Sequence, residues 1–167
     1  MATPAAGRPF MPGYGIAGPD EGGGLLPWSW AEERLAGSHT YWLVTVRPDG
    51  RPHAMPVWAV WDDGALWFSS AVGSRKIRNL RAERRCVATT EDGRRPVVVE
   101  GRATIVTEPA SLQRLVDLEN AKYGTALDVA FLDPAVNATV RVDPERVFGL
   151  DEDAFSDSPT RWELEGA

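Results

Sequence analysis

The chain has 167 residues, 43% of them hydrophobic, and a formal net charge of −6 at pH 7. This length and hydrophobic content indicate one globular domain with a substantial core, and the acidic balance argues against general nucleic-acid binding through bulk electrostatics. A single cysteine excludes an internal disulfide and a cysteine zinc cluster, and with only two histidines we expect no structural metal site.

The first 24 residues differ in composition from the rest of the chain. They hold four prolines and seven glycines, and such a segment cannot bury enough apolar surface to offset its ordering entropy. We therefore expect a flexible arm over residues 1–24 and a single domain over 25–167. The arm has no signal-peptide core and no apolar run approaches the ~20 residues of a membrane span, so we expect a cytoplasmic protein without a membrane partner.

A short helix is the first element predicted in the domain. Ser29 and Glu32 have the Ser-x-x-Glu spacing of a capping box, which favours a helix that ends near Gly37. Trp30 and Leu35 are its candidate inward residues.

Three strands with tight turns are predicted next. β-Branched and aromatic residues are concentrated in these segments, and Arg47–Gly50 and Asp62–Gly64 have the composition of turns. Pro52 and Pro56 lack an amide hydrogen, so the second strand should be bulged or exposed at an edge near Met55. The three strands are Thr40–Val46, Arg51–Trp61 and Ala65–Phe68.

A helix over Arg75–Arg84 follows, with Ser74 as its N-cap. Cations are disfavoured at a helix N-terminus by the helix dipole, yet Arg75 and Lys76 occupy the first two positions. Free amides at that end already favour an anion, so two cations beside them indicate a phosphate site. The alternative is an ordinary solvated helix start.

The second half of the chain continues the alternation of strands and helices. Gly101 lies inside a predicted strand, which suggests a bulge or a close backbone approach. Gly124 is expected to end a long helix. In chain order we predict strands Arg85–Thr90 and Pro96–Thr107, a helix capped by Thr107 and running to Tyr123, a short helix over Val129–Leu132, and strands Asn137–Val142 and Arg146–Leu150.

Six or seven strands joined mostly by tight turns, with two main helices, suit a closed or partly closed antiparallel barrel with helices packed outside it.

Three sequence elements resemble a known family. They are Met55-Pro56-Val57-Trp58, Trp67-Phe68-Ser69-Ser70 and Ser74-Arg75-Lys76-x-x-Asn79-Leu80. Together they resemble the pyridoxamine 5′-phosphate oxidase-like split barrels, and most closely the actinobacterial oxidoreductases that use FMN or the deazaflavin coenzyme F420. The resemblance covers roughly residues 28–162, about one domain. It implies a mainly β fold, a six-stranded antiparallel Greek-key split β-barrel with flanking helices, which forms a homodimer with two cofactor sites at the subunit interface.

The resemblance also implies which residues bind the cofactor. Ser70 and Ser74 lie beside the phosphate site, although strand-end solvation and helix capping would explain them as well. The ending Thr160-Arg161-Trp162 is similar to the family's ending, but Glu163-Leu164 follows where many relatives continue with Arg and an aromatic residue. The expected cofactor-binding residues are His53, Met55, Pro56, Val57, Trp58, Ser69, Ser70, Ser74, Arg75, Lys76, Asn79, Arg161 and Trp162.

The predicted function is an F420-dependent reductase that transfers a hydride to a small electron-poor organic molecule. Because the cofactor carries the difficult chemistry, no catalytic acid or base is nominated. The alternatives are an FMN-dependent oxidoreductase and a non-catalytic flavin or haem carrier. Arg78, Arg81 and Arg85 would form a cationic face that could hold the carboxylate-bearing F420 tail, or a solvated face paired with Glu83.

Overall fold

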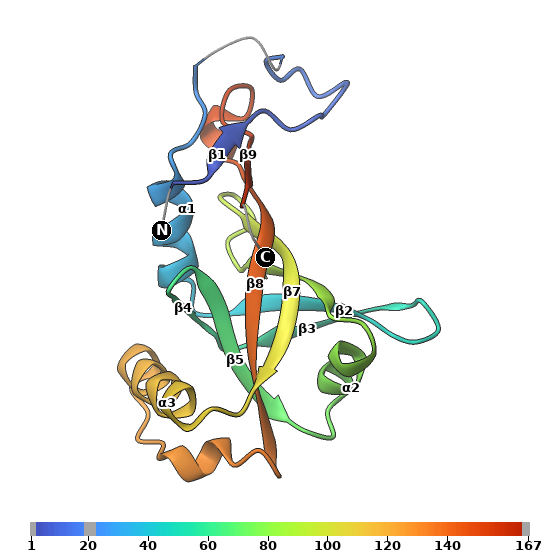
Figure 1. The fold of residues 1–167 in the computed structure, drawn as a ribbon. Coiled ribbons are helices and arrows are strands. Elements are labelled where there is room, and N and C mark those ends of the chain that lie inside the picture. Colours follow the sequence, from blue (N-terminus) through green and yellow to red (C-terminus); the bar gives the residue numbers. More distant parts are fainter. Residues whose placement is uncertain (1–2, 19–22, 165–167) are drawn as a thin grey trace.

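The computed structural model describes residues 3–18 and 23–164. In this part of the chain, nine strands, three α-helices and two 3₁₀ helices follow one another (Figure 1). In order they are β1 (Ala5–Gly7), α1 (Trp28–Gly37), β2 (Tyr41–Val46), β3 (Pro52–Val57), β4 (Val60–Asp62), β5 (Ala65–Ala71), α2 (Arg75–Ala82), β6 (Arg85–Thr90), β7 (Val97–Val106), α3 (Pro109–Tyr123), η1 (Val129–Leu132), β8 (Asn137–Gly149), η2 (Glu152–Ala154) and β9 (Thr160–Glu163).

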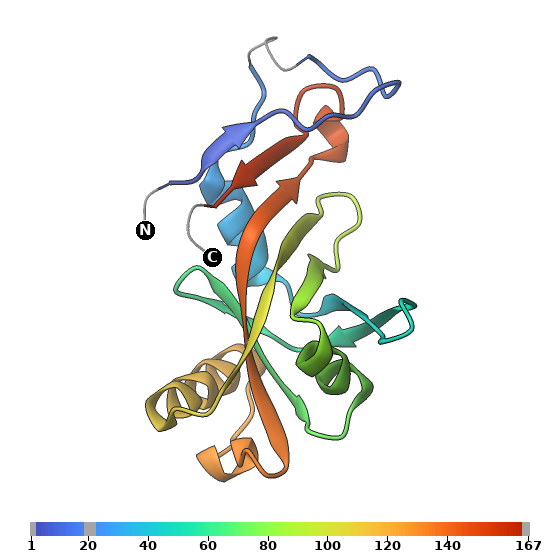
Figure 2. The same ribbon diagram turned by 45° about the vertical axis from the view of Figure 1, so that its right-hand side comes forward.

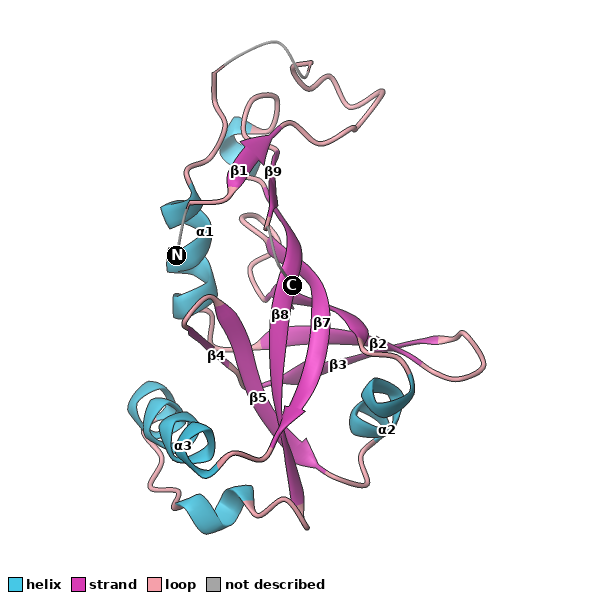
Figure 3. Cartoon of the chain, in the orientation of Figure 1, coloured by secondary structure: helices cyan, strands magenta, loops and turns pink. Residues whose placement is uncertain are grey.

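The strands form one antiparallel sheet that curves into a split barrel. Its order is β1-β9-β8-β7-β6-β2-β3, and β5 joins it through β8 while also pairing with β4. The helices lie outside the curved sheet, with α2 on the opposite side from α1 and α3 (Figure 3). The expected mainly β, antiparallel split-barrel class is therefore confirmed.

The core fills the barrel and continues under α3. Tyr41, Leu43 and Phe68 point into the barrel and are at most 1% exposed. A second cluster packs α3 against the β4–β5 hairpin through residues such as Val60 and Leu115. Alternation along β5 explains both clusters, because Phe68 faces the barrel while its neighbour Trp67 faces α3.

Two strand expectations are confirmed in detail. β3 pairs only with β2 among the described strands, so the proline-containing strand lies at an edge of the sheet. The β7–β8 ladder shifts register between Glu100 and Gly101, which is the expected bulge. A Cβ atom at Gly101 would lie 2.3 Å from the carbonyl oxygen of Asp143, so this position requires glycine.

The strand count differs from the expected six or seven. The predicted strand Arg51–Trp61 is interrupted at Trp58 and Ala59, which separate β3 from β4. The two predicted strands at the C-terminal end are instead one strand, β8, whose residue Pro144 lies opposite the bulge in β7. The short strands β1 and β9 were not predicted.

The capping predictions for α1 and α3 were wrong. Pro27 is the N-cap of α1 and makes no side-chain capping bond, so Ser29 and Glu32 form no capping box. The side chain of Glu108, and not that of Thr107, accepts the amides that open α3. Pro109 explains the shift, because its ring fixes the backbone at the first helical position one residue later than expected. The predicted stop at Gly124 is confirmed by its left-handed φ of 65°.

β1 belongs to the predicted arm and extends the sheet. Ala5–Gly7 pair with β9, and Arg8 donates a hydrogen bond to the carbonyl oxygen of Gly23 at 2.7 Å. The division into an arm and a domain stays a prediction, and residues 1–2, 19–22 and 165–167 lie outside the described residues. No helix in the described ranges is long and apolar enough to cross a membrane.

Candidate functional site

The N-terminus of α2 combines a capped helix start with two adjacent cations. Ser74 has an extended backbone, and its hydroxyl accepts the amide of Ile77 at 3.4 Å, as expected of an N-cap. Arg75 and Lys76 follow immediately, so both positive charges lie where the helix dipole is also positive. This concentration of positive charge favours the binding of an anion.

Lys76 reaches back from the helix to the end of β5. Its ammonium group donates to the Ser70 hydroxyl at 3.2 Å, and Ser70 donates to the Ser74 hydroxyl at the same distance. Burial lowers the pKa of Lys76 below its ordinary value. None of the described carboxylates forms an ion pair with Arg75 or Lys76. We call Ser70, Ser74, Arg75 and Lys76 the cation cluster.

β3 turns alternate side chains toward α2. In the β2–β3 ladder His53 lies opposite Thr45, and Met55 lies opposite Leu43. Thr45 and Leu43 are buried in the barrel, so His53 and Met55 lie on that same face. Pro56 lies on the other face, where its partner Trp42 is exposed. Any contact of Pro56 with a ligand on the barrel side is therefore through its backbone.

Asn79 links α2 to these strands. Its side-chain amide donates to the hydroxyl of Thr45 at 2.9 Å, and Thr45 donates to the carbonyl oxygen of His53 at 3.4 Å. Asn79 and Thr45 are both fully buried. This chain of hydrogen bonds fixes the cation cluster relative to β3.

Several buried polar atoms at this site have no hydrogen-bond partner in the described part of the chain. They are Nε of Arg47, Nδ1 of His53 and Oδ1 of Asn79. A buried polar atom without a partner costs free energy, so native proteins rarely keep one unless a ligand or water satisfies it. Together with the cation cluster, these atoms fit a ligand that carries a phosphate and a polar ring.

Strand alternation separates two of the predicted residues. Ser69 lies opposite Thr139 in the β5–β8 ladder, on the face of β5 that carries Trp67, whereas Ser70 faces the cation cluster. The structure therefore brings Ser70 to the site but leaves the Ser69 side chain on the other face of the strand.

Trp58 lies directly after β3 and is held by the end of α3. Its ring stacks on Tyr123 with 4.4 Å between centroids and 7° between planes, and the ring of His39 packs edge-on against both. Lys122 donates to the hydroxyl of Tyr41 at 3.0 Å and to the carbonyl oxygen of Ala59 at 2.9 Å. Burial lowers the pKa of Lys122 to about 8.

Two of the predicted residues lie elsewhere in the single chain. Arg161 and Trp162 belong to β9, which lies at the far end of the sheet from α2 (Figures 1 and 2). Trp162 is fully buried and packs edge-on against Trp28 with 5.6 Å between centroids. Within one chain neither residue lies near the cation cluster, so their expected role beside the cofactor stays a prediction.

The predicted cationic face along α2 is shorter than expected. The helix ends at Ala82, so Arg85 belongs to β6 and is not on the helix. Arg85 pairs with Glu83 at 2.7 Å, and this hydrogen-bonded partner lowers the pKa of Glu83 to about 2. Arg78 and Arg81 form no ion pair among the described residues and remain exposed.

Four residues near the site were not predicted from the sequence: Arg47, Thr45, Lys122 and Tyr123. Arg47 and Thr45 could have been identified from the sequence, because the Arg47–Gly50 turn sets the register that brings Thr45 opposite His53. Lys122 and Tyr123 reach the end of β3 from a distant helix, and no local signal marks them.

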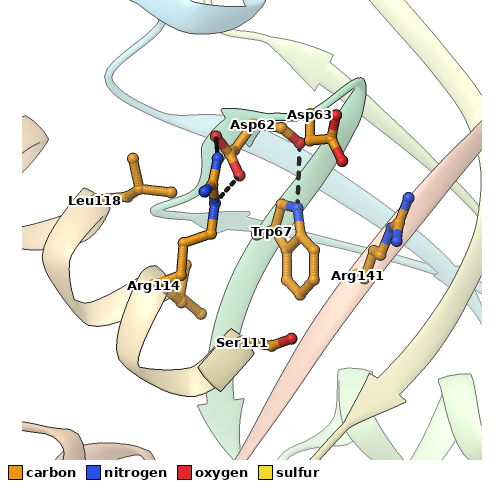
Figure 4. Close-up of a pocket in the computed structure, with 8 residues that line it drawn as sticks. Asp62, Asp63, Trp67, Ser111, Arg114, Leu118 and Arg141 are labelled. Carbon is orange, nitrogen blue, oxygen red and sulfur yellow. Dashed lines mark hydrogen bonds and ion pairs between the residues drawn. The ribbon is translucent and has the colours of Figure 1, made fainter. Parts of the chain in front are cut away.

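A separate pocket of about 470 Å³ lies between α3 and the β4–β5 hairpin (Figure 4). Arg114 forms a two-bond ion pair with Asp62 at 2.6 and 2.7 Å, and Arg141 lies 5.4 Å from the centre of the Trp67 ring. None of the predicted cofactor-binding residues lines this pocket.

Solved structures of other proteins share this fold. A conserved hypothetical protein from Mycobacterium tuberculosis is 28% identical, with 81% of this chain and 83% of that chain covered and a TM-score of 0.62. General stress protein 26 from Bacillus anthracis is 20% identical, with coverages of 81% and 97% and a TM-score of 0.65. A protein described as an F420 reductase is 24% identical, with coverages of 73% and 98% and a TM-score of 0.58.

No curated protein matches the chain. A family model described as pyridoxamine 5′-phosphate oxidase, in contrast, matches residues 30–151. This range contains the barrel strands β2 to β8 and the cation cluster at α2. The chain therefore belongs to the pyridoxamine 5′-phosphate oxidase-like split-barrel family.

Proposed function

We propose that this protein is an F420-dependent oxidoreductase, which transfers a hydride between bound deazaflavin and a small electron-poor organic substrate. The observation that carries the proposal is the cation cluster, in which Arg75 and Lys76 lack a carboxylate partner among the described residues and lie at a helix N-terminus. Membership of a flavin-type oxidoreductase family and the fold shared with an F420 reductase support it.

In this proposal the chain's own residues bind the cofactor and orient its ring. The cation cluster would hold the phosphate through charge-assisted hydrogen bonds, and Asn79 would keep α2 at the correct distance from β3. Met55, Val57 and the backbone of β3 would form the floor under the ring, with Trp58 at its end. The bound deazaflavin supplies the hydride chemistry, so the protein needs no acid or base of its own.

A homodimer is part of this proposal. On the outer face of β2, Trp42 is 46% exposed and Val46 is 38% exposed, which leaves an apolar sheet surface for a second copy. A shared site would also explain why Arg161 lies far from the cation cluster in one chain, since a partner could supply it. An isologous dimer is the expected state in light scattering, and a monomer that still binds cofactor tightly would refute the shared site.

FMN is the second candidate cofactor. Coenzyme F420 carries a tail of carboxylates beyond its phosphate, which requires free cations outside the cation cluster. Arg85 is paired with Glu83, and Arg84 donates to the carbonyl oxygen of Ala103 at 2.8 Å and to the hydroxyl of Thr104 at 2.5 Å. Only Arg78 and Arg81 therefore remain for the tail on this helix, and FMN needs neither of them.

One experiment tests the proposal and separates the alternatives. The purified protein is titrated with F420 and with FMN, and the better ligand is then reduced and mixed with a panel of electron acceptors. Tighter F420 binding with turnover is the expected result. Tighter FMN binding would assign the flavin instead, and tight binding without turnover on any acceptor would indicate a carrier.

A further inference from the structure

His53 brings an unsatisfied nitrogen to the cation cluster. It lies on the face of β3 that carries Met55, and its backbone carbonyl is tied through Thr45 to Asn79 of α2. Its Nδ1 is buried and has no hydrogen-bond partner among the described residues. The backbone of His53 is therefore tied to α2 through Thr45 and Asn79, and one ring nitrogen is left without a partner.

The charges that act most strongly on His53 are all positive. They come from Arg47 in the β2–β3 turn and from Lys76 and Arg75 at the start of α2. Thr45, which lies opposite His53 in the β2–β3 ladder, and Asn79, which donates a hydrogen bond to Thr45, are both uncharged. Burial of the ring, followed by repulsion from these three cations, lowers the pKa of His53 below its ordinary value, so the imidazole is neutral near pH 7.

An anion in the cation cluster reverses this balance. Two negative charges would screen the three cations from the ring and attract a proton to it, because an opposite charge at short range favours the protonated imidazole. A bound dianion therefore favours protonation of His53, whereas the single charge of a monoanion favours it much less.

We propose that His53 takes up a proton from solvent when a dianionic phosphate monoester binds at the cation cluster. The proposal rests on the proposed function only in that a phosphate-bearing cofactor occupies this site. No covalent bond forms or breaks, because a solvent proton simply moves to an imidazole nitrogen. FMN ends in such a monoester, while the phosphate of F420 is a singly charged diester.

Proton uptake can be measured directly by calorimetry. Titrations of FMN at pH 7.5 in two buffers with different ionisation enthalpies should show uptake of up to about one proton per bound phosphate, and F420 should show much less. Between pH 7 and 8.5, FMN affinity should fall by up to about tenfold per pH unit. This range lies above the second phosphate pKa of about 6, so the ligand's own ionisation adds little.

The chain offers a matched control because it contains only two histidines. His53→Gln keeps hydrogen-bonding groups but cannot take up the proton, so FMN should still bind with no uptake and a flat pH profile. His39→Gln changes the ring that packs against Tyr123 and should leave proton uptake as in the wild type. Uptake that persists in His53→Gln would overturn the proposal.

A smaller probe separates this proposal from the proposed function. Inorganic phosphate should shift the His53 imidazole resonances toward the protonated form in a pH titration followed by NMR, while those of His39 stay unchanged. If no flavin binds but phosphate produces this shift, the proposed function fails and the role of His53 holds. If flavins bind with no proton uptake and no shift with phosphate, the role of His53 fails and the function stands.

Discussion

Lys76→Ala is the most direct test of the phosphate site. Lys76 is half-buried, its ammonium group donates to the neutral Ser70 hydroxyl at 3.2 Å, and burial lowers its pKa. No described carboxylate pairs with this ammonium group, so its charge is available to a ligand. A charge-assisted hydrogen bond contributes roughly 1.5–3 kcal/mol, and about 1.4 kcal/mol corresponds to a tenfold change in affinity, so FMN affinity should fall by about one to two decades.

The assay is a fluorescence titration of the two proteins with FMN. Thermal unfolding of Lys76→Ala should match the wild type, because alanine has the highest helix propensity and no ion pair is lost. Arg81→Ala provides the matched control, since it removes an exposed, unpaired cation from the same helix farther from the cation cluster. FMN affinity in Lys76→Ala that stays within twofold of the wild type would mean that this charge does not contact the phosphate.

Three further predictions concern the cofactor tail, the bulge and Lys122. Neutralising Arg78 and Arg81 together should weaken F420 binding at low salt and leave FMN binding almost unchanged, and equal losses for both ligands would refute a role in holding the tail. Gly101→Ala should destabilise the fold by about 1–3 kcal/mol, because its Cβ would meet a backbone carbonyl at 2.3 Å. A melting temperature equal to that of Gly93→Ala, where a Cβ meets nothing within 4 Å, would contradict this. Since burial lowers the pKa of Lys122 to about 8, the unfolded chain binds more protons above that pH, and the stability of the wild type relative to Lys122→Met should rise between pH 8 and 9.5. Urea unfolding of both proteins at about pH 8 and about pH 9.5 measures the difference between their free energies of unfolding. A difference that stays the same at the two pH values would refute the prediction.

Local patterns were sufficient for most of the barrel. β6 was predicted with its observed bounds, and β2 and β7 to within one residue at each end, because β-branched residues alternate there between clear turn signals. The bulge at Gly101 was also predictable, since a glycine inside a strand usually marks a bulge or a close backbone approach. These features depend only on neighbouring residues.

Features that depend on distant partners could not be predicted. β1 and β9 are short and gain their stability from pairing: β1 pairs with β9 across more than a hundred residues, and β9 pairs in turn with β8. The same holds for the contact between Trp58 and Tyr123, which joins the end of β3 to the end of α3. Propensity carries no information about such pairs, because their geometry is set by the whole curved sheet.

The candidate site shows both cases. The cluster of Ser70, Ser74 and Lys76 follows from two neighbouring motifs, and the structure assembles it with hydrogen bonds of 3.2 Å. Ser69 was grouped with Ser70 because they are adjacent, although successive side chains of a strand point to opposite faces. Strict use of that alternation would have separated them from the sequence alone.

The pairing of β1 with β9 bears on how the protein tolerates truncation. β1 covers the outer edge of β9, and Arg8, directly after β1, donates a hydrogen bond to the carbonyl oxygen of Gly23. Removing the first eight residues would leave the backbone amides and carbonyls along that edge of β9 without partners, which is the geometry that recruits strands from other molecules. The glycine- and proline-rich beginning of this chain thus protects a sheet edge against aggregation, even though it contributes little to the core.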